Sequence, residues 1–462
     1  MEKTSTENLL ATGSIGRLIA RFAIPSVVAM LVNALYNIVD QIFIGRSIGY
    51  LGNGAANVVL LVTLVALSFS LLLGDGAAAY YNLKLGAGER ETAARGAGNA
   101  IAAIVAVSLA VMAVCLIFLE PILRLFGATE ALMGYAKDYG WIVVLGLPFL
   151  MVSTSLNSII RADGSPRYAM LSMILGAVIN GCLDPIFLFG FGWGIRGAAM
   201  ASLIGQLVSC SLSAAYLRRI KCVKLDRRAF RPAPRVIGKI CTLGISSFID
   251  QAAFTLVMAV NNNLIVHYGA LTSYGSEIPL TSYGISMKVQ EILFTVLLGV
   301  AIGMQPIVSY NYGAGNWVRV KRAYRTAVAI GTVISVAATA LFIFWPDPLI
   351  HLFGTQDGSP YFAFSKHFFQ TYFLFYLFFG FQTITGVFFQ AIGKPLQAAV
   401  LSLSYQLVFK ILSAVLLSAA IGLDGVLWSG PAADLLIFGL SAIFIALEMR
   451  NLNRRIRRHA TT

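Results

Sequence analysis

Two aspartates stand inside long apolar stretches of this sequence, where a charged group needs a physical reason to be. Asp40 lies in the first such stretch, and Asp184 follows Asn180 by four residues. A carboxylate in a membrane-spanning helix costs about 2.5–3.5 kcal/mol on insertion scales, so it indicates function. The spacing places Asn180 and Asp184 on one helix face. Carboxylate and amide oxygens suit an alkali cation, or the carboxylates hold a proton, so we predict a Na⁺ or H⁺ site at Asp40, Asn180 and Asp184.

The neighbours of these aspartates are also polar. Asn33 and Asn37 lie along the same helical stripe as Asp40, and we include both among the candidates for a substrate cleft. Pro185 directly follows Asp184 and removes one helical hydrogen bond, which frees a carbonyl oxygen one turn earlier as a further ligand. The alternative is that Asp184 lies near the outer end of its helix and simply meets water.

The second half of the chain has a different set of polar residues. Lys288 and Glu291 are three residues apart on one expected helix, so the two charges can neutralise each other. This pair is either a structural clamp or a second coupling or substrate-contact site. We count Lys288, Gln290 and Glu291 as candidates for the substrate cleft. Asp250 and Lys410 also fall in apolar stretches, and the sequence assigns them no role.

Motifs typical of catalysis are missing from the sequence. It contains no nucleophile elbow, Walker loop or zinc-binding pattern. Its five cysteines show no CxxC spacing, so we expect free thiols and no structural metal site. We therefore expect no enzymatic activity and no cofactor, and we expect an ion gradient to supply the energy.

The composition explains what must position these polar groups. Of 462 residues 58% are hydrophobic and 12% are charged, and the mean hydropathy is +0.79. Lipid is the natural solvent for so much apolar surface, and each spanning helix needs roughly 20 residues. The apolar runs are continuous rather than alternating, which argues against a β-barrel. The sequence predicts an all-α membrane protein with spans at residues 15–45, 54–83, 93–119, 132–161, 168–190, 196–218, 236–266, 281–311, 322–345, 361–391, 396–420 and 425–449.

The basic residues predict the orientation of the chain in the membrane. Of the 34 lysines and arginines, 27 fall on the side that carries both termini. The opposite loops hold only Arg46, Arg124, Lys137, Arg196 and Lys366. By the positive-inside rule both termini are cytoplasmic, and we expect a multi-pass protein of the bacterial cytoplasmic membrane. The net charge of +14 reflects this orientation, so we expect no nucleic-acid partner.

The two halves of the chain repeat each other. Residues 85–88 and 120–127 match 312–315 and 347–354 at a spacing of 227, while 162–166 matches 391–395 at 229 and 194–197 matches 422–425 at 228. Two halves of six spans each insert in the same direction, and such parallel repeats with substrate between them are a transporter plan. We therefore divide the chain into an N-lobe (1–218), a basic cytoplasmic linker (219–235), a C-lobe (236–450) and a basic cytoplasmic tail (451–462).

An ordered set of short motifs resembles the multidrug and toxic compound extrusion (MATE) transporters, with the MepA-like bacterial branch most similar. The resemblance covers nearly the whole chain. It rests on Asn37-Ile38-Val39-Asp40, Arg161-Ala162-Asp163-Gly164-Ser165-Pro166, Asn180-Gly181-Cys182-Leu183-Asp184-Pro185, Gly197-Ala198-Ala199-Met200-Ala201-Ser202, Gln305-Pro306-Ile307 and Gln390-Ala391-Ile392-Gly393-Lys394-Pro395. One departure is Gly74-Asp75-Gly76, where an acid replaces the small residue that we expect.

The resemblance implies two six-helix lobes around a central cleft, and export of drug-like, often cationic compounds in exchange for Na⁺ or H⁺. The cation site of the family falls on Asp40, Asn180 and Asp184, the residues already singled out. The resemblance adds Ser202 as a hydroxyl ligand and Asn157 as a candidate near the same cavity. Our hypothesis for the mechanism is alternating access, in which ion binding at the N-lobe carboxylates Asp40 and Asp184 weakens drug binding. The expected partners are small lipophilic or cationic drugs and the lipid bilayer, and we expect a functional monomer.

Two alternatives stay open at this stage. A flippase for lipid-linked saccharides would need a cleft lined with many basic residues, whereas only Lys288 and Lys410 lie within spans. A membrane-embedded transferase would need catalytic His or Asp residues clustered at one membrane interface, and the sequence shows no such cluster. Extra spans, or activity without an ion gradient, would favour either alternative.

Overall fold

The computed structural model describes residues 5–48, 50–126, 128, 130–275, 277–351 and 360–460. Within these ranges some side chains lie outside the described part, among them those of 33–39. Within these ranges the chain is helical and contains no strand. The long helices of the first half are α2 (Ile15–Ile48), α3 (Tyr50–Gly86), α4 (Arg90–Ile117), α6 (Glu130–Ala162), α7 (Pro166–Pro185) with the π-helical turn η1 (Ile186–Gly190), and α8 (Ile195–Tyr216). Those of the second half are α9 (Pro234–Gly269), α10 (Glu277–Gly313), α11 (Trp317–Phe344), α13 (Pro360–Tyr372) with η4 (Tyr376–Phe378) and α14 (Phe379–Ala391), α15 (Pro395–Leu403) with η5 (Ser404–Ile411) and α16 (Leu412–Ile421), and α17 (Leu423–Ala460).

These helices confirm the predicted spans. Eleven are long and apolar enough to cross a membrane, and a bent pair, Pro360–Tyr372 with Tyr376–Ala391, makes twelve. The two parts of this broken span meet at 46°. The last span continues as helix to Ala460, through most of the segment expected to be a tail. The short helices are α1 (Ser5–Thr12), α5 (Leu119–Leu125), α12 (Asp347–His351), η2 (Leu217–Arg219) and η3 (Arg227–Phe230).

The repeated motifs are the turns between helices. Gly88 and Gly315, which are 227 residues apart, have φ angles of 82° and 74°. Gly164 and Gly393 have φ angles of 84° and 73°. Only glycine adopts this left-handed conformation without strain, so the same turn recurs in both halves. Proline occupies the first helical turn after the second pair of turns, at the start of α7 and of α15, where its missing N–H has no partner to lose.

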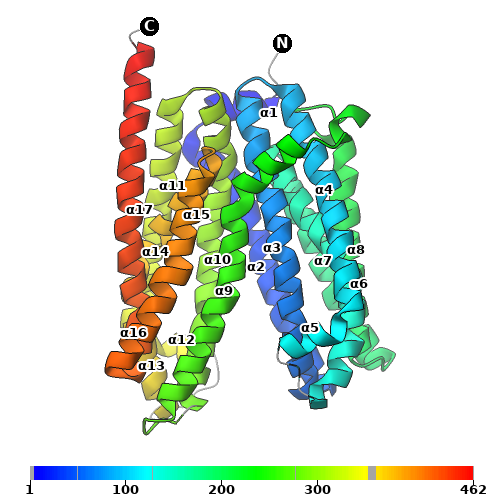
Figure 1. Cartoon of the computed structure of the whole chain (residues 1–462), viewed down its shortest axis with the longest axis vertical. Helices are drawn as coiled ribbons and strands as arrows, with labels where there is room; N and C mark the ends of the chain where they lie inside the picture. Colours follow the sequence, from blue (N-terminus) through cyan, green and yellow to red (C-terminus); the bar gives the residue numbers. More distant parts are fainter. Residues whose placement is uncertain are drawn as a thin grey trace.

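The helices form two bundles related by the sequence repeat, which we call the N bundle (α2–α8) and the C bundle (α9–α17). The ribbons approach each other at the end of the molecule where α1 and the last turns of α17 lie, and they diverge at the opposite end (Figure 1). We call these ends the termini side and the far side. The bundles pack through α2 and α3 of the first against α9 and α10 of the second.

Glycines let the two bundles touch through their backbones. A Cβ atom added at Gly76 would lie 2.1 Å from the carbonyl oxygen of Ile240, and one at Gly244 would lie 1.9 Å from that of Leu72. This is a reciprocal contact between α3 and α9. Because a side chain at either glycine would meet backbone rather than a movable side chain, close packing here requires glycine.

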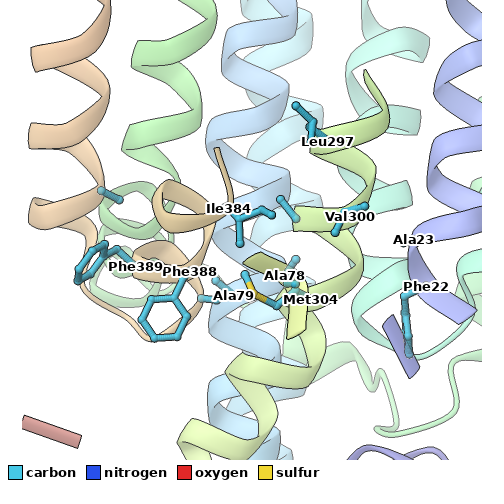
Figure 2. Packing of buried hydrophobic residues seen from close by; sticks show 14 of the residues in the cluster. Phe22, Ala23, Ala78, Ala79, Leu297, Val300, Met304, Ile384, Phe388 and Phe389 are labelled. Atoms are coloured by element: carbon cyan, nitrogen blue, oxygen red, sulfur yellow. The ribbon is translucent and has the colours of Figure 1, made fainter. Parts of the chain in front are cut away.

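Close glycine contacts of the same kind recur at positions that are related by the sequence repeat. Gly86 approaches the carbonyl of Tyr310 while Gly313, its repeat partner, approaches that of Leu83. Gly303, which lies 227 residues after Gly76, packs on Ala23 of α2. Buried apolar side chains surround these contacts, among them Ala78 and Ala79 of α3 and Met304 of α10 (Figure 2). All of these contacts involve the parts of α2, α3, α9 and α10 that lie toward the termini side.

On the far side the facing surfaces are open. Lys288 lies eleven residues before Gly299, about three turns away on the same face of α10. Gly299 packs tightly on Val27 of α2, whereas Lys288 is exposed. Val65, seven residues before Leu72 on α3, is 48% exposed. The faces that join the bundles on the termini side are therefore uncovered further out, and they form a central cleft.

Two polar side chains attach the chain between the bundles to the N bundle. Asn99 of α4 donates to the carbonyls of Ala229 (3.0 Å) and Arg231 (3.1 Å) and accepts from the N–H of Ala233 (2.7 Å). Asp163 accepts from the backbone N–H groups of Lys221 and Cys222. This connection is thus packed on the N bundle at both of its ends.

Candidate functional site

The N bundle brings the predicted coupling residues together. Asp40 comes from α2, Asn180 and Asp184 come from successive turns of α7, and Ser202 comes from α8. All four are buried: Asp184 has no exposed surface, and the others are at most 8% exposed. The interpretation that Asp184 simply meets water at a helix end is therefore wrong. α7 packs against both α2 and α8, which accounts for this convergence.

The site has many oxygen atoms and few donors. Asn180 Nδ2 donates to Ser202 Oγ at 3.1 Å. Both carboxylate oxygens of Asp184, Oδ1 of Asp40 and the amide oxygen of Asn180 are buried and receive no hydrogen bond. The carboxyl groups of Asp40 and Asp184 also interact electrostatically with each other. Two neighbouring buried carboxylates without donors are unstable as a pair of anions, so the arrangement favours a bound cation or a proton.

The donor set fits a hard monovalent cation or a proton. Within the described ranges no group of three or more His, Cys, Asp or Glu side chains could hold a metal ion, so a transition-metal centre has no support there. Carboxylate, amide and hydroxyl oxygens on three helices are what Na⁺ would use. A proton shared by the two carboxyl groups would satisfy the same oxygens. Both ions therefore remain compatible with this site.

Pro185 explains the local shape of α7 at the site. It closes α7 and is followed by the wide π-helical turn η1, in which the N–H of Phe191 reaches the carbonyl of Ile186. Proline cannot donate to the carbonyl one turn earlier, and wide turns of this kind occur often at functional positions. The local sequence thus loosens the helix directly after Asp184, while the aspartate itself stays buried between neighbouring helices.

The other predicted residues of the first half are placed differently. Asn157 of α6 is buried inside the N bundle, and its amide oxygen accepts from Ser172 of α7 (2.9 Å) and Ser213 of α8 (3.2 Å). It connects three helices and does not contact the carboxylate pair through these bonds. The side chains of Asn33 and Asn37 lie outside the described residues.

The candidates on α10 lie where the bundles diverge. Lys288 and Glu291 are exposed and Gln290 is half-buried. Lys288 and Glu291 interact electrostatically, as their spacing predicts. The structure does not bring them to the carboxylate pair of the N bundle, and it leaves Lys288 facing the cleft.

Comparison with known proteins now decides the family. A model of the MatE family matches residues 25–186 and 252–416, one stretch in each bundle. The chain belongs to the MATE family. The two matched stretches have nearly equal length, as expected from the internal repeat.

Two named relatives of this MATE chain come from staphylococci. The Multidrug export protein MepA of Staphylococcus aureus (strain MSSA476) is 26% identical over 437 residues, which cover 93% of each chain. The protein of the same name from Staphylococcus haemolyticus (strain JCSC1435) is 24% identical over 443 residues, covering 95% of this chain and 94% of the relative. The match thus extends through both bundles.

Solved structures share the MATE fold of this chain. One is a MOP superfamily transporter from Pyrococcus furiosus, described as having a binding pocket of reverse polarity that suggests a different function. It has a TM-score of 0.90 at 22% identity, covering 98% of this chain and 100% of that chain. Another is an outward-facing multidrug resistance MATE transporter, with a TM-score of 0.90 at 22% identity and coverage of 98% and 99%. At this identity the likeness shows the fold alone.

The C bundle of this MATE chain contains polar groups that the sequence analysis missed or left without a role. Asp434 of α17 is buried and accepts from Tyr405 Oη at 3.0 Å. Lys410 lies over the Tyr405 ring, 4.7 Å from its centroid. Ser402 donates to Asp250 at 2.9 Å. Asp434 stands in an apolar run, so the criterion that selected Asp40 would have selected it too.

Asp163 is a second residue whose importance the sequence analysis missed. Its carboxylate has no exposed surface and accepts hydrogen bonds from Tyr81 Oη and Tyr216 Oη, both at 2.7 Å. The two N–H groups of Lys221 and Cys222 complete its shell at 2.8 and 3.0 Å. Asp163 therefore ties α3, α8 and the chain after α8 to the turn between α6 and α7. Its motif was recognised only as part of the family pattern.

Proposed function

We propose that this protein is a secondary active multidrug efflux transporter that exports lipophilic or cationic compounds by antiport with Na⁺ or H⁺. The observation that carries the proposal is the buried pair Asp40 and Asp184 in the N bundle, where both carboxylate oxygens of Asp184 and Oδ1 of Asp40 lack donors. The multidrug export function in the names of the MepA relatives supports the substrate class. The ion gradient supplies the energy, and the scheme requires no cofactor.

The proposed cycle exchanges ion for drug through the N bundle. A cation or proton that enters from outside neutralises Asp40 and Asp184, which changes the packing of α2 against α7. That change weakens drug binding in the cleft, and the drug leaves outward before the ion is released to the cytoplasm. For exchange to occur, ion and drug must bind the two conformations differently. We place the drug near Lys288, Gln290 and Glu291, with Asn33 and Asn37 on the facing helix.

We assign the termini side to the cytoplasm, because the basic loops gather there. The bundles pack together on that side and diverge on the other, so the structure corresponds to an outward-facing state. We place the division between the two lobes at the linker, residues 219–235. We infer a monomer in the bacterial cytoplasmic membrane as the functional unit, since each chain contains both lobes and the cleft between them.

The test is movement of ethidium in proteoliposomes with Na⁺ and pH gradients imposed separately. We expect one gradient to drive transport by the native chain, and Asp40→Asn and Asp184→Asn each to lower the driven rate by at least about tenfold, since each removes one of the two charges that the ion neutralises. Asp138→Asn is the matched control, because Asp138 is an exposed aspartate paired with Arg196.

The outcomes of this experiment distinguish drug antiport coupled at Asp40 and Asp184 from the alternatives. Full gradient-driven transport by folded Asp40→Asn would contradict coupling at this site. If neither gradient moves ethidium through the native protein, drug antiport is wrong and a lipid flippase becomes the better assignment. Folding of each variant is checked by a single symmetric peak in size-exclusion chromatography.

A further inference from the structure

The backbone around Asp75 is enclosed by helices of both bundles. Asp75 lies on α3 between two glycines. A Cβ atom at Gly74 would lie 2.7 Å from the Cα of Ser155 in α6, within the N bundle. One at Gly76 would lie 2.1 Å from the carbonyl oxygen of Ile240 in α9, across the contact of α2 and α3 with α9 and α10, which we call the seam. The two glycines therefore let α3 approach both neighbours, and they leave the carboxylate of Asp75 at the junction of the bundles.

The carboxylate uses one oxygen for each bundle. Its Oδ1 accepts from Ser158 Oγ of α6 at 2.9 Å, and its Oδ2 accepts from Ser247 Oγ of α9 at 3.1 Å. Within the N bundle, Arg161 Nη2 donates to the Ser158 hydroxyl at 2.9 Å. Behind Ser247, Gln390 Nε2 of α14 donates to its hydroxyl at 3.2 Å. A chain of hydrogen bonds thus runs from the N bundle through Asp75 into the C bundle.

This chain of hydrogen bonds can be broken between Asp75 and Ser247 while each residue keeps one other hydrogen-bond partner. If α3 and α9 separate, Asp75 keeps Ser158 and the nearby positive charge of Arg161, with which it interacts electrostatically. Ser247 keeps Gln390. An unpaired buried charge would make separation prohibitive, whereas loss of one charge-assisted bond makes it a reversible step. The hydrogen bond between Asp75 and Ser247 can therefore break and form again as α3 and α9 separate and return.

We propose that Asp75 is a positioning residue of the transport cycle, whose hydrogen bond to Ser247 latches the two bundles together on the termini side. The latch is closed in this structure and opens when the cleft becomes accessible from that side. The inference rests on the proposed alternating-access function. It also gives a role to Asp75, the acid that stands where the resemblance to the family leads us to expect a small residue.

The test measures how often the seam opens in the full chain, without substrate or ion gradient. Ala79 lies on the seam-facing stripe of α3 and has no exposed surface. In a background with the native cysteines replaced by alanine, Ala79→Cys in lipid nanodiscs is alkylated by a water-soluble maleimide only when the seam opens. The rate reports even a small open population, because it scales with the opening equilibrium when closing is fast.

We expect Asp75→Ala and Ser247→Ala each to raise this alkylation rate by about tenfold, the effect of losing one hydrogen bond to a charged group. The double variant should match the single variants, because all three remove the same bond. Ser155→Ala is the matched control. It removes a serine hydroxyl that donates to the Ser70 carbonyl at 2.8 Å within the N bundle, so the rate should stay unchanged.

An unchanged rate in both Asp75→Ala and Ser247→Ala would overturn the latch. So would an equal rise at Ala201→Cys, a buried position of α8 inside the N bundle, since that result would indicate general loosening. Ethidium transport is measured separately. If the native chain shows no ethidium antiport but the variants show the predicted alkylation pattern, the transport assignment is wrong and the latch stands. If the native chain shows antiport and the variants leave the alkylation rate unchanged, the latch alone is wrong.

Discussion

Asp163 and Asp184 are both aspartates of the N bundle without exposed surface, and they differ in the donors around them. Asp163 receives two tyrosine hydroxyls and two backbone N–H groups, so its charge is fully compensated by neutral donors. The oxygens of Asp184 receive none, and its nearest charged partner is another carboxyl group. The first aspartate is therefore a structural anion, and the second is available to a cation or a proton.

Replacing Asp163 by Asn should destabilise the fold without abolishing transport per folded molecule. The amide has one acceptor oxygen in place of two, and its NH₂ group would face donors. Loss of at least two hydrogen bonds to a buried charge should lower the free energy of unfolding by about 3 kcal/mol. Thermal unfolding in detergent measures this, with the exposed Asp226→Asn as the control. Equal melting temperatures for the two variants would contradict the structural role.

Ser202 should tune ion affinity through Asn180. Its hydroxyl oxygen accepts a hydrogen bond from the side-chain amide of Asn180. Ser202→Ala removes this bond, so the amide is free to rotate and the Asn180 oxygen is misplaced. By analogy with outer-shell partners of metal ligands, we expect the apparent affinity for the driving ion to fall by about tenfold, with little change in the maximal rate. The dependence of ethidium transport on ion concentration measures it. Ser209→Ala on the same helix is the control, and equal ion dependence would exclude the role.

At the level of helices, glycine spacing decides where the two bundles can touch. α9 contains a matched pair of glycines: Gly244 packs against the Leu72 carbonyl, while Gly238 has open space around it. A methyl group at Gly244 would meet backbone at 1.9 Å, so α3 and α9 must move apart. The same substitution at Gly238 removes backbone freedom without creating a clash.

We therefore expect Gly244→Ala to favour separation of the bundles on the termini side and to slow ethidium transport by at least about tenfold, as overpacking typically costs 1–3 kcal/mol. Gly238→Ala should transport as the native chain does. The alkylation rate of Ala79→Cys should rise in the first variant only. Identical rates in the two variants would show that the α3–α9 contact does not control the seam.

The two halves of the molecule use the same turn with different chemistry. The turn after α6 contains Asp163, which accepts hydrogen bonds from four donors elsewhere in the chain. The repeated turn after α14 contains Lys394, which pairs with the buried Glu448 of α17. The backbone of both turns depends on a glycine with positive φ, so the repeat preserves geometry and not side-chain interactions. This asymmetry is consistent with ion coupling being assigned to one bundle.

For the whole molecule, orientation in the membrane decides whether a conformation is outward-facing or inward-facing. The termini side holds most of the basic residues, including the stretch from Arg218 to Lys239. We expect a fluorescent reporter fused to the C-terminus to be bright in cells, because the positive-inside rule places that end in the cytoplasm. An alkaline phosphatase fusion at the same place should be inactive. The reverse pattern would make this structure an inward-facing state.

The sequence by itself determined the spans, their number and the repeat. Transfer of an apolar segment into lipid and the φ preference of glycine are local properties, so windows of about twenty residues and single turns suffice to predict them. It also selected Asp40, Asn180 and Asp184, because a carboxylate in an apolar run is unfavourable wherever the run packs.

Only the tertiary structure decided which polar groups have partners. The donors of Asp163 come from residues 53 to 82 positions away, and the bond from Ser247 to Asp75 spans 172 positions. It also placed Asn157 in a network inside the N bundle and left Lys288 exposed to the cleft. Hydrogen bonds between distant helices depend on how the helices pack, and no local pattern of residues encodes which donor will meet which acceptor.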